Sequence, residues 1–314
     1  MSLFPRHAEA VLAGVPRSKG SKVFVCDAVN GNDSNTGLSF EDPVKTIEAA
    51  YALTTTLKND VILLVGNGTS YSSAAAIVWS KDFVHLIGLN SGGPEPRSRI
   101  KCAAALATTP FITWSGDGCI VRNISFWHET TDALGLVNVL VSGGRNTFEG
   151  CQFAGGIGTN NATGARSLKV GGANASGNTF KNCVIGLDTV QSVAGNYQLE
   201  FVTRAMHTTF EDCIFPMNAG ATTSACVYAA AAAGVGRMNI FRRCFFHNCS
   251  TAVQAEVFSL DAALDAEMRI FVFDSWMYRI AKWDSANNGV VTNVTIAANT
   301  TGANTGNLMV ITSG

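Results

Sequence analysis

The stretch Phe148-Glu-Gly-Cys151-Gln-Phe153 decides the fold, because its pattern of side chains returns along the chain at a steady interval. An apolar residue stands at the first and sixth slots of the pattern, and in four copies the fourth slot is cysteine. The copies begin 27, 32, 30, 31 and 32 residues apart, at Val121, Phe148, Phe180, Phe210, Phe241 and Phe273. A repeat of about 20 to 50 residues is typical of solenoids, so the sequence predicts a column of stacked coils.

The three apolar slots cannot all face one side of a straight strand, because residues three apart point to opposite faces. They can share one interior if the strand bends between them, and the third slot carries Gly, Asn, Asp, Arg or Ser at residues 150, 182, 212, 243 and 275. We therefore interpret each copy as two short strands joined at a sharp corner. The pattern predicts a core ladder made of Phe148, Cys151, Phe180, Cys183, Phe210, Cys213, Phe241, Cys244, Phe273 and Trp276.

The composition of the chain indicates which classes of partner the protein binds. The 314 residues carry a net charge of −1, and only 14% of them are charged, which gives no electrostatic case for binding nucleic acid or a membrane surface. The hydrophobic share is 47%, which an apolar interior along the whole column explains in part. We also expect outer faces to be covered by neighbouring subunits, and we predict a homo-oligomer, most simply a trimer.

Nine cysteines would suggest disulfides in a small secreted chain, but their number is odd and the chain is large. Cysteines on successive coils would lie about 4.8 Å apart with parallel Cβ directions, which is poor disulfide geometry. No CxxC pair suggests zinc. The sequence therefore predicts a reduced, buried ladder of thiols.

The chain divides into an arm and one long domain. We interpret residues 1–20 as an N-terminal arm and residues 21–314 as a single β-helix domain. Within that domain, residues 21–71 are expected to form a capping strand, loop and helix, and residues 72–314 the coils. No run reaches the roughly 20 apolar residues of a transmembrane helix, and the first residues do not resemble a signal peptide, so we expect synthesis and assembly in a cytoplasm.

A helix is predicted after the first strand. Asp42 and Pro43 are a suitable pair for the N-cap and first helical position. An apolar stripe with helical spacing predicts that this helix covers the open end of the first coil; it consists of Val44, Ile47, Ala50, Tyr51, Leu53 and Leu57.

The opening of the domain contains four motifs: Asn30-Gly31-Asn32-Asp33-x-Asn35-x-Gly37, Pro43-x-x-Thr46-Ile47-x-x-Ala50, Asp60-Val61-Ile62 and Gly68-x-x-Tyr71. With these motifs it resembles the right-handed parallel β-helix proteins of the pectate-lyase-like superfamily. The resemblance implies an all-β, right-handed parallel β-helix with an N-terminal capping α-helix. Bacteriophage tailspikes and other virion appendages are of this kind, as are polysaccharide lyases and hydrolases. One fold hosts many functions, so the resemblance is more specific for the fold than for an activity.

Acidic side chains are the weak candidates for chemistry, since enzymes on this scaffold use them on one sheet. The catalytic candidates are Asp188, Glu200 and Arg204 in one coil, and Glu256, Asp261, Asp265 and Glu267 in another. Asp27, Asn30, Asn32 and Asp33 are the weak candidates for a metal site. The alternatives are a solvated outer face for the first group and Asx turns that bond their own backbone for the second. Trp127 and Trp276 are expected in the core rather than in a sugar-binding groove.

These observations favour a non-enzymatic structural protein of a phage virion, either a capsid decoration or cement protein or a tail or fibre component. It would work as a rigid, symmetric column without a cofactor. Its partners would be its own copies and major capsid or tail proteins, with surface polysaccharide as a further candidate. The alternative is a polysaccharide lyase or hydrolase acting as a depolymerase. A bacterial surface or carbohydrate-binding module is a third, weaker hypothesis, because no export signal is present.

Overall fold

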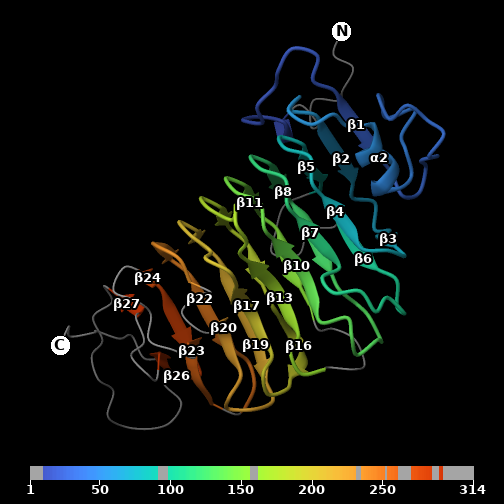
Figure 1. Cartoon of the computed structure of the whole chain (residues 1–314). Helices are drawn as coiled ribbons and strands as arrows, with labels where there is room; N and C mark the ends of the chain where they lie inside the picture. The colour runs from blue at the N-terminus through green and yellow to red at the C-terminus, as the bar shows by residue number, and fades with distance from the viewer. Residues whose placement is uncertain are drawn as a thin grey trace.

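The protein is a column of parallel β-strands that wind through three sheets (Figure 1). The computed structural model describes residues 10–90, 98–155, 162–230, 235–251, 253–260, 270–284 and 290–292. In this part of the chain the sheets contain 10, 9 and 8 strands, and we call them sheets A, B and C. Each coil runs through A, then B, then C, and every strand pairs in parallel with its counterpart in the next coil. The prediction of a parallel β-helix is therefore confirmed.

The strands are short, as the repeat predicts. Sheet A contains β1 Val23–Cys26, β2 Val61–Val65, β5 His85–Leu89, β8 Ile120–Arg122, β11 Thr147–Glu149, β14 Thr179–Lys181, β18 Thr209–Glu211, β21 Asn239–Arg242, β24 Ile270–Phe273 and β27 Val290–Thr292. Sheet B contains β3 Tyr71–Ser73, β6 Ser98–Cys102, β9 Ile124–Trp127, β12 Gln152–Ala154, β15 Val184–Ile185, β16 Leu187–Ser192, β19 Ile214–Ala219, β22 Phe245–Asn248 and β25 Trp276–Tyr278. Sheet C contains β4 Ile77–Trp79, β7 Ile112–Trp114, β10 Val137–Val141, β13 Arg166–Val170, β17 Tyr197–Phe201, β20 Ala225–Ala229, β23 Gln254–Leu260 and β26 Ile280–Asp284.

The first slot of the repeat forms a stack of phenylalanine rings inside the column. Phe148, Phe180, Phe210 and Phe241 are register partners in sheet A, and all four are fully buried. Their ring centroids are 4.9, 4.9 and 4.7 Å apart, with nearly parallel planes. The sequence spacing thus becomes a continuous apolar core along the column axis.

The corner between sheets A and B is one left-handed residue in each coil from β8 onward. Asn123, Gly150, Asn182, Asp212 and Arg243 have φ values between 50 and 61°. Glycine, asparagine and aspartate tolerate this conformation better than other residues. The predicted bend at residues 150, 182, 212 and 243 is therefore confirmed.

The last copy of the repeat begins one residue earlier in the chain than the sequence predicts. Val272, not Phe273, pairs with Phe241 in sheet A, and the left-handed residue is Asp274, with φ of 49°. Trp276 is consequently not in the core, and 51% of its surface is exposed. The error arose because Phe273 and Trp276 were matched by residue type, whereas the corner fixes the register.

The fourth slot holds buried thiols. Cys151, Cys183, Cys213 and Cys244 are at most 1% exposed, and no cysteine in the structure is in a disulfide. Each thiol lies within 3.3 to 3.6 Å of a carbonyl oxygen of its own coil and of one in the preceding coil. Burial raises the pKa of the Cys183 thiol. In the last coil, the hydroxyl of buried Ser275 occupies this slot and accepts a hydrogen bond from the amide of Cys244.

Helix α2, Ile47–Leu53, is shorter than predicted and begins later. Its N-cap is Thr46, whose hydroxyl accepts a hydrogen bond from the amide of Ala49, whereas Asp42 accepts hydrogen bonds from Thr36. Leu57 is outside the helix and exposed. The buried residues of the helix, Ile47 and Ala50, belong to the main core cluster, beside β1. No helix in the described residues is long and apolar enough to cross a membrane.

The described part of the N-terminal arm packs on the outer face of sheet A. Val15 is 7% exposed and belongs to a small apolar cluster with Val23, Val61, Leu63 and Ile87. Val11 and Leu12 pack against the same cluster. Residues 11–15 therefore lie over the first strands of the sheet, and Ala10 and Val11 lie beside the corner with sheet B.

Candidate functional site

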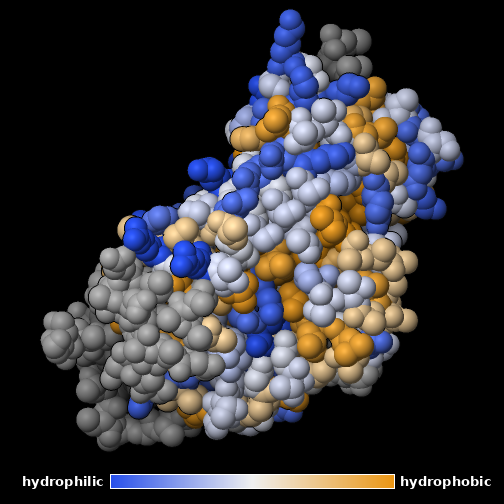
Figure 2. Space-filling model, viewed as in Figure 1, coloured by the Kyte–Doolittle hydropathy of each residue, from blue (hydrophilic) through white to orange (hydrophobic). Residues whose placement is uncertain are grey.

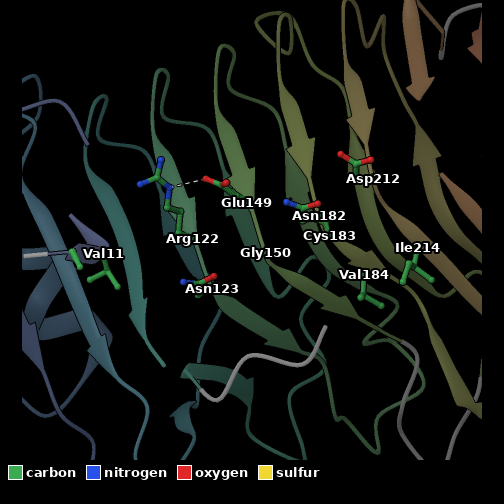
Figure 3. Close-up of a pocket in the computed structure, with 11 residues that line it drawn as sticks. Val11, Arg122, Asn123, Glu149, Gly150, Asn182, Cys183, Val184, Asp212 and Ile214 are labelled. Carbon is green, nitrogen blue, oxygen red and sulfur yellow. Dashed lines mark hydrogen bonds and ion pairs between the residues drawn. The ribbon is translucent and has the colours of Figure 1, made fainter. Parts of the chain in front are cut away.

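A groove of about 680 Å³ lies on the outside of the corner between sheets A and B; we call it the corner groove. Its wall on one side is the arm, and its floor comes from successive coils of the corner (Figure 3). It is lined by Ala10, Val11, Arg122, Asn123, Glu149, Gly150, Asn182, Cys183, Val184, Asp212 and Ile214. The same corner position thus contributes a polar side chain in several coils.

The left-handed corner residues put these side chains on the outside of the column. Parallel strands are about 4.8 Å apart, so equivalent corner residues follow one another at that step. Gly150 lacks a side chain, and a Cβ atom there would lie 2.7 Å from Oδ1 of Asn123. The amide of Asn123 therefore lies against Gly150, while the side chain of Asn182, in the following coil, is exposed.

An ion pair joins the groove to the arm. Nε of Arg122 lies 2.8 Å from Oε2 of Glu149, as the dashed line in Figure 3 shows. Nη1 of Arg122 donates a hydrogen bond of 2.8 Å to the carbonyl oxygen of Ala13. One arginine therefore orders both the floor and the wall of the groove.

A second arginine holds the other carboxylate of the groove. Nε and Nη2 of Arg243 donate hydrogen bonds of 2.7 and 2.9 Å to the two oxygens of Asp212, and Nη2 also reaches Glu211 at 2.6 Å. These bonds hold the pKa of Asp212 below its usual value. Both carboxylates that line the groove, Glu149 and Asp212, are thus paired with arginine.

The groove becomes apolar where it passes onto sheet B. Val184 and Ile214 line it there, and 38% of the surface of Ile214 is exposed. The same two residues also line a second recess of about 300 Å³ on the outer face of sheet B. The other side chains of this recess are Gln152, Leu187, Asp188, Pro216, Phe245 and His247, around Gly186. The corner groove and this recess are therefore adjacent, and Val184 and Ile214 line both.

The predicted catalytic residues are not brought together. Glu200 is buried on sheet C, where its Oε2 lies 2.6 Å from Nε of Arg166 and 3.1 Å from Nζ of Lys169. Asp188 is exposed on β16 of sheet B, and Arg204 is exposed in a turn after β17, with φ of 60°. In the described residues no hydrogen bond or ion pair joins these three. They were grouped because they lie in one coil, but one coil passes through three faces of the column.

The remaining candidates lie elsewhere or outside the described residues. Asp261, Asp265 and Glu267 lie outside them, and Glu256 is on β23. Trp127, expected in the core, is half-buried, with the guanidinium of Arg99 4.3 Å from its ring centroid.

The acidic loop after β1 uses its carboxylates to hold its own backbone. Asp27 accepts hydrogen bonds from the amides of Val29 and Asn30 and from the side chains of Asn30 and Asn67. Asp33 accepts hydrogen bonds from the amides of Lys45 and Thr46. Within the described ranges, no group of three or more His, Cys, Asp or Glu side chains is placed to hold a metal ion.

A buried histidine near the groove makes the stability of this end of the column depend on pH. Burial, with the charges of Arg17 and Arg122, lowers the pKa of His85 to about 4, against an opposing effect of Asp60. Its Nδ1 accepts a hydrogen bond from the amide of Ile120, so the ring is neutral in the folded chain. The unfolded chain binds a proton more readily between pH 6.5 and 4, so stability falls as the pH falls through this window, by up to about 3 kcal/mol.

We expect His85→Gln to reduce that pH dependence in urea titrations at pH 7, 5.5 and 4.5, without abolishing it, because burial also lowers the pKa of His128 to about 4. His207→Gln is the matched control, because His207 is exposed. An unchanged slope in His85→Gln would assign the loss at low pH to other groups.

Comparison with known proteins supports the fold alone. No family model matches the chain, and no curated protein matches it. Among solved structures, a pectin methylesterase in complex with a hexasaccharide has 15% identity and a TM-score of 0.56 over 83% of this chain and 80% of its own. The pectin methylesterase of Erwinia chrysanthemi has 14% identity and a TM-score of 0.52, over 87% and 81%. A pectate lyase has 11% identity and a TM-score of 0.50, over 89% and 80%. The chain has the parallel β-helix fold that these solved structures share.

Proposed function

We propose that this protein binds a polysaccharide in the corner groove and holds it without cleaving it. The observation that carries the proposal is the groove itself, an open channel along the corner with amide, carboxylate and guanidinium groups on successive coils. Sugar hydroxyls need donors and acceptors at this kind of spacing, and the apolar faces of sugar rings need surfaces such as Val184 and Ile214. Neighbours in fold include a pectin methylesterase solved with a hexasaccharide, which supports the substrate class by analogy of fold alone.

The amide side chains of the groove are available to a ligand. In the described residues, neither the Asn123 nor the Asn182 side chain is engaged in a hydrogen bond, and Asn182 is exposed. Amides offer both donors and acceptors, as sugar hydroxyls do. Asn123 is additionally held in place by its contact with Gly150.

The state of the carboxylates favours binding over hydrolysis. A glycosidase needs a protonated carboxylic acid, and its pKa is raised for that purpose. Here Arg243 lowers the pKa of Asp212, and Arg122 is bonded to Glu149. A carboxylate whose pKa is lowered by arginine does not supply a general acid, and both carboxylates of the groove are paired with an arginine that fixes them in place.

The proposal predicts specific retention of a polysaccharide by the folded chain. The test is affinity electrophoresis against pectin, polygalacturonate, alginate, dextran and bacterial capsular polysaccharides, followed by calorimetry on any polymer that retards the protein. We expect Asn182→Ala to weaken binding about three- to tenfold, which is the loss of about one hydrogen bond. Asn174→Ala is the matched control, since Asn174 is also exposed but follows β13, at the end of sheet C.

Two results would overturn the proposal. One is the absence of retardation by every polymer of the panel while the protein remains folded by circular dichroism. The other is equal weakening by Asn182→Ala and Asn174→Ala, which would locate binding away from the corner groove. Release of reducing or unsaturated ends during incubation would overturn the non-catalytic part and restore the lyase or hydrolase alternative.

A structural role in a phage virion, as a capsid decoration protein or a tail component, is the second candidate. It is supported by exposed apolar side chains far from the groove, with Val78 and Leu134 55% and 66% exposed. Figure 2 shows hydrophobic residues gathered over the face on which strands of sheet C lie in Figure 1. Such surfaces mark subunit contacts. Analytical ultracentrifugation is expected to give a trimer, and a monomer without affinity for capsid or tail proteins would rule this role out.

A further inference from the structure

Four aromatic side chains form an array on the outer face of sheet B, near the C-terminal end of the column; we call it the aromatic quartet. Phe245 and His247 lie on β22, and Trp276 and Tyr278 lie opposite them on β25. The rings of Phe245 and His247 are 5.5 Å apart, and those of His247 and Tyr278 are 5.4 Å apart. Trp276 and Tyr278 are 51% and 41% exposed.

Strand alternation explains why the quartet faces solvent. Phe246 and Met277, between its members, point into the core and are at most 4% exposed. Exposed rings of this size are costly in water, and rings with a polar edge suit ligands that are partly apolar and partly hydrogen-bonding. The indole N–H, the phenol O–H and the imidazole nitrogens give three of the four rings such an edge. Sugar rings, with an apolar face and hydroxyls around it, have the complementary surface.

The quartet continues the proposed binding site. Phe245 and His247 line the recess of about 300 Å³ on sheet B, and its other side includes Val184 and Ile214, which also line the corner groove. The outward row of sheet B runs coil by coil from Val184 through Ile214 and Phe245 to Trp276, whereas Gln152 and Ser125, which precede them in the same row, are buried. Three steps of about 4.8 Å give an accessible strip about 14 Å long.

We infer that one polysaccharide chain occupies this whole strip, running along the column from the corner groove onto the aromatic quartet. The inference rests on the proposed function and adds that the ligand is a polymer several sugar rings long. The corner groove supplies hydrogen bonds and the quartet supplies ring stacking. Affinity therefore increases with chain length until the strip is full, because each added ring gains a contact without a new cost of association.

The test uses the full chain and oligosaccharides of defined length, from disaccharide to decasaccharide, prepared from whichever polymer of the panel retards the protein, with polygalacturonate as the first probe. We expect the affinity of the wild-type chain to rise at least tenfold over this series. The double substitution Trp276→Ala and Tyr278→Ala is expected to remove most of that rise. Because about half of the surface of each residue is exposed, the variant should keep a cooperative thermal transition that falls by only a few degrees.

The outcomes separate this inference from the proposed function. Equal binding of long oligosaccharides by the double variant and the wild type, while Asn182→Ala weakens them, would overturn the inference and leave the corner groove as the site. An affinity that does not depend on length would overturn it as well. A double variant that binds normally but changes from oligomer to monomer in ultracentrifugation would show that a second copy of the chain covers the quartet. If neither the double variant nor Asn182→Ala bound the oligosaccharides more weakly than the wild type, the corner groove itself would not be the binding site.

Discussion

Replacing Phe210 with alanine is expected to lower the free energy of unfolding by about 3–5 kcal/mol. Its ring is fully buried and stacks between Phe180, at 4.9 Å, and Phe241, at 4.7 Å. Removing it leaves a cavity in the middle of the ring stack, and the neighbouring coils cannot close it because their backbones are fixed by the sheet ladders. Equilibrium denaturation in urea, followed by circular dichroism, measures the loss.

Trp276→Ala is the matched control for this prediction. It also removes a large aromatic ring, but 51% of the residue's surface is exposed, so the loss should stay below about 1 kcal/mol. Met277→Ala, at the neighbouring buried position, should cost about 2–5 kcal/mol. If Trp276→Ala were as costly as Phe210→Ala, the register of the last coil would be wrong.

Replacing Gly171 with alanine is expected to cost about 3–5 kcal/mol, which combines overpacking with backbone strain. Gly171 directly follows β13 and has φ of 149°. A Cβ atom there would overlap the carbonyl oxygen of Val202 in the next coil. The amide of Gly171 also donates to the carbonyl of Val141 in the preceding coil, so the residue cannot move aside without breaking contact with one neighbour.

Gly68→Ala separates the two contributions to this cost. Gly68 has φ of 91°, and nothing lies within 4 Å of the place of its Cβ atom. Gly68→Ala therefore introduces backbone strain alone, which lowers the free energy of unfolding by about 1 kcal/mol. If the two variants lost similar amounts of stability in urea denaturation, the close approach of coils at Gly171 would contribute nothing to the cost of Gly171→Ala.

The repeat predicted the fold because it specifies one interior. Phe180 and Cys183 cannot share a side of a straight strand, so a corner at Asn182 follows from the residues alone. The thiol ladder followed in the same way, since a small apolar side chain suits a slot that is repeated at each coil. The spacing of residues within the repeat was therefore sufficient to predict the architecture.

Errors appeared where the pattern became ambiguous. Val272 and Phe273 are both apolar, and only the left-handed residue at Asp274 identifies the register. At the helix, Asp42 and Thr46 are both suitable N-caps in sequence. The loop decided between them, because the carboxylate of Asp42 is engaged by Thr36.

The corner groove was not predictable from the repeat. Its floor comes from corner residues that were interpreted only as bends, and its wall comes from Ala10 and Val11, more than a hundred residues away in sequence from Arg122. Only tertiary packing of the arm on sheet A brings these together. Candidate residues were instead chosen by acidity within one coil, and this choice found Glu200, whose charge is neutralised by Arg166.

The one-residue corner between sheets A and B also determines where the chain tolerates a change of length. From Val121 onward the distance from the first to the sixth slot is fixed, whereas successive coils, counted from Val121 to Phe148, Phe180, Phe210, Phe241 and Val272, differ in length. All of that variation lies between the sixth slot in sheet B and the return to sheet A, in the connections before and after the strands of sheet C. A peptide grafted into those connections would leave the spacing between successive corners unchanged. The corner edge therefore keeps a constant geometry while the connections can be exchanged.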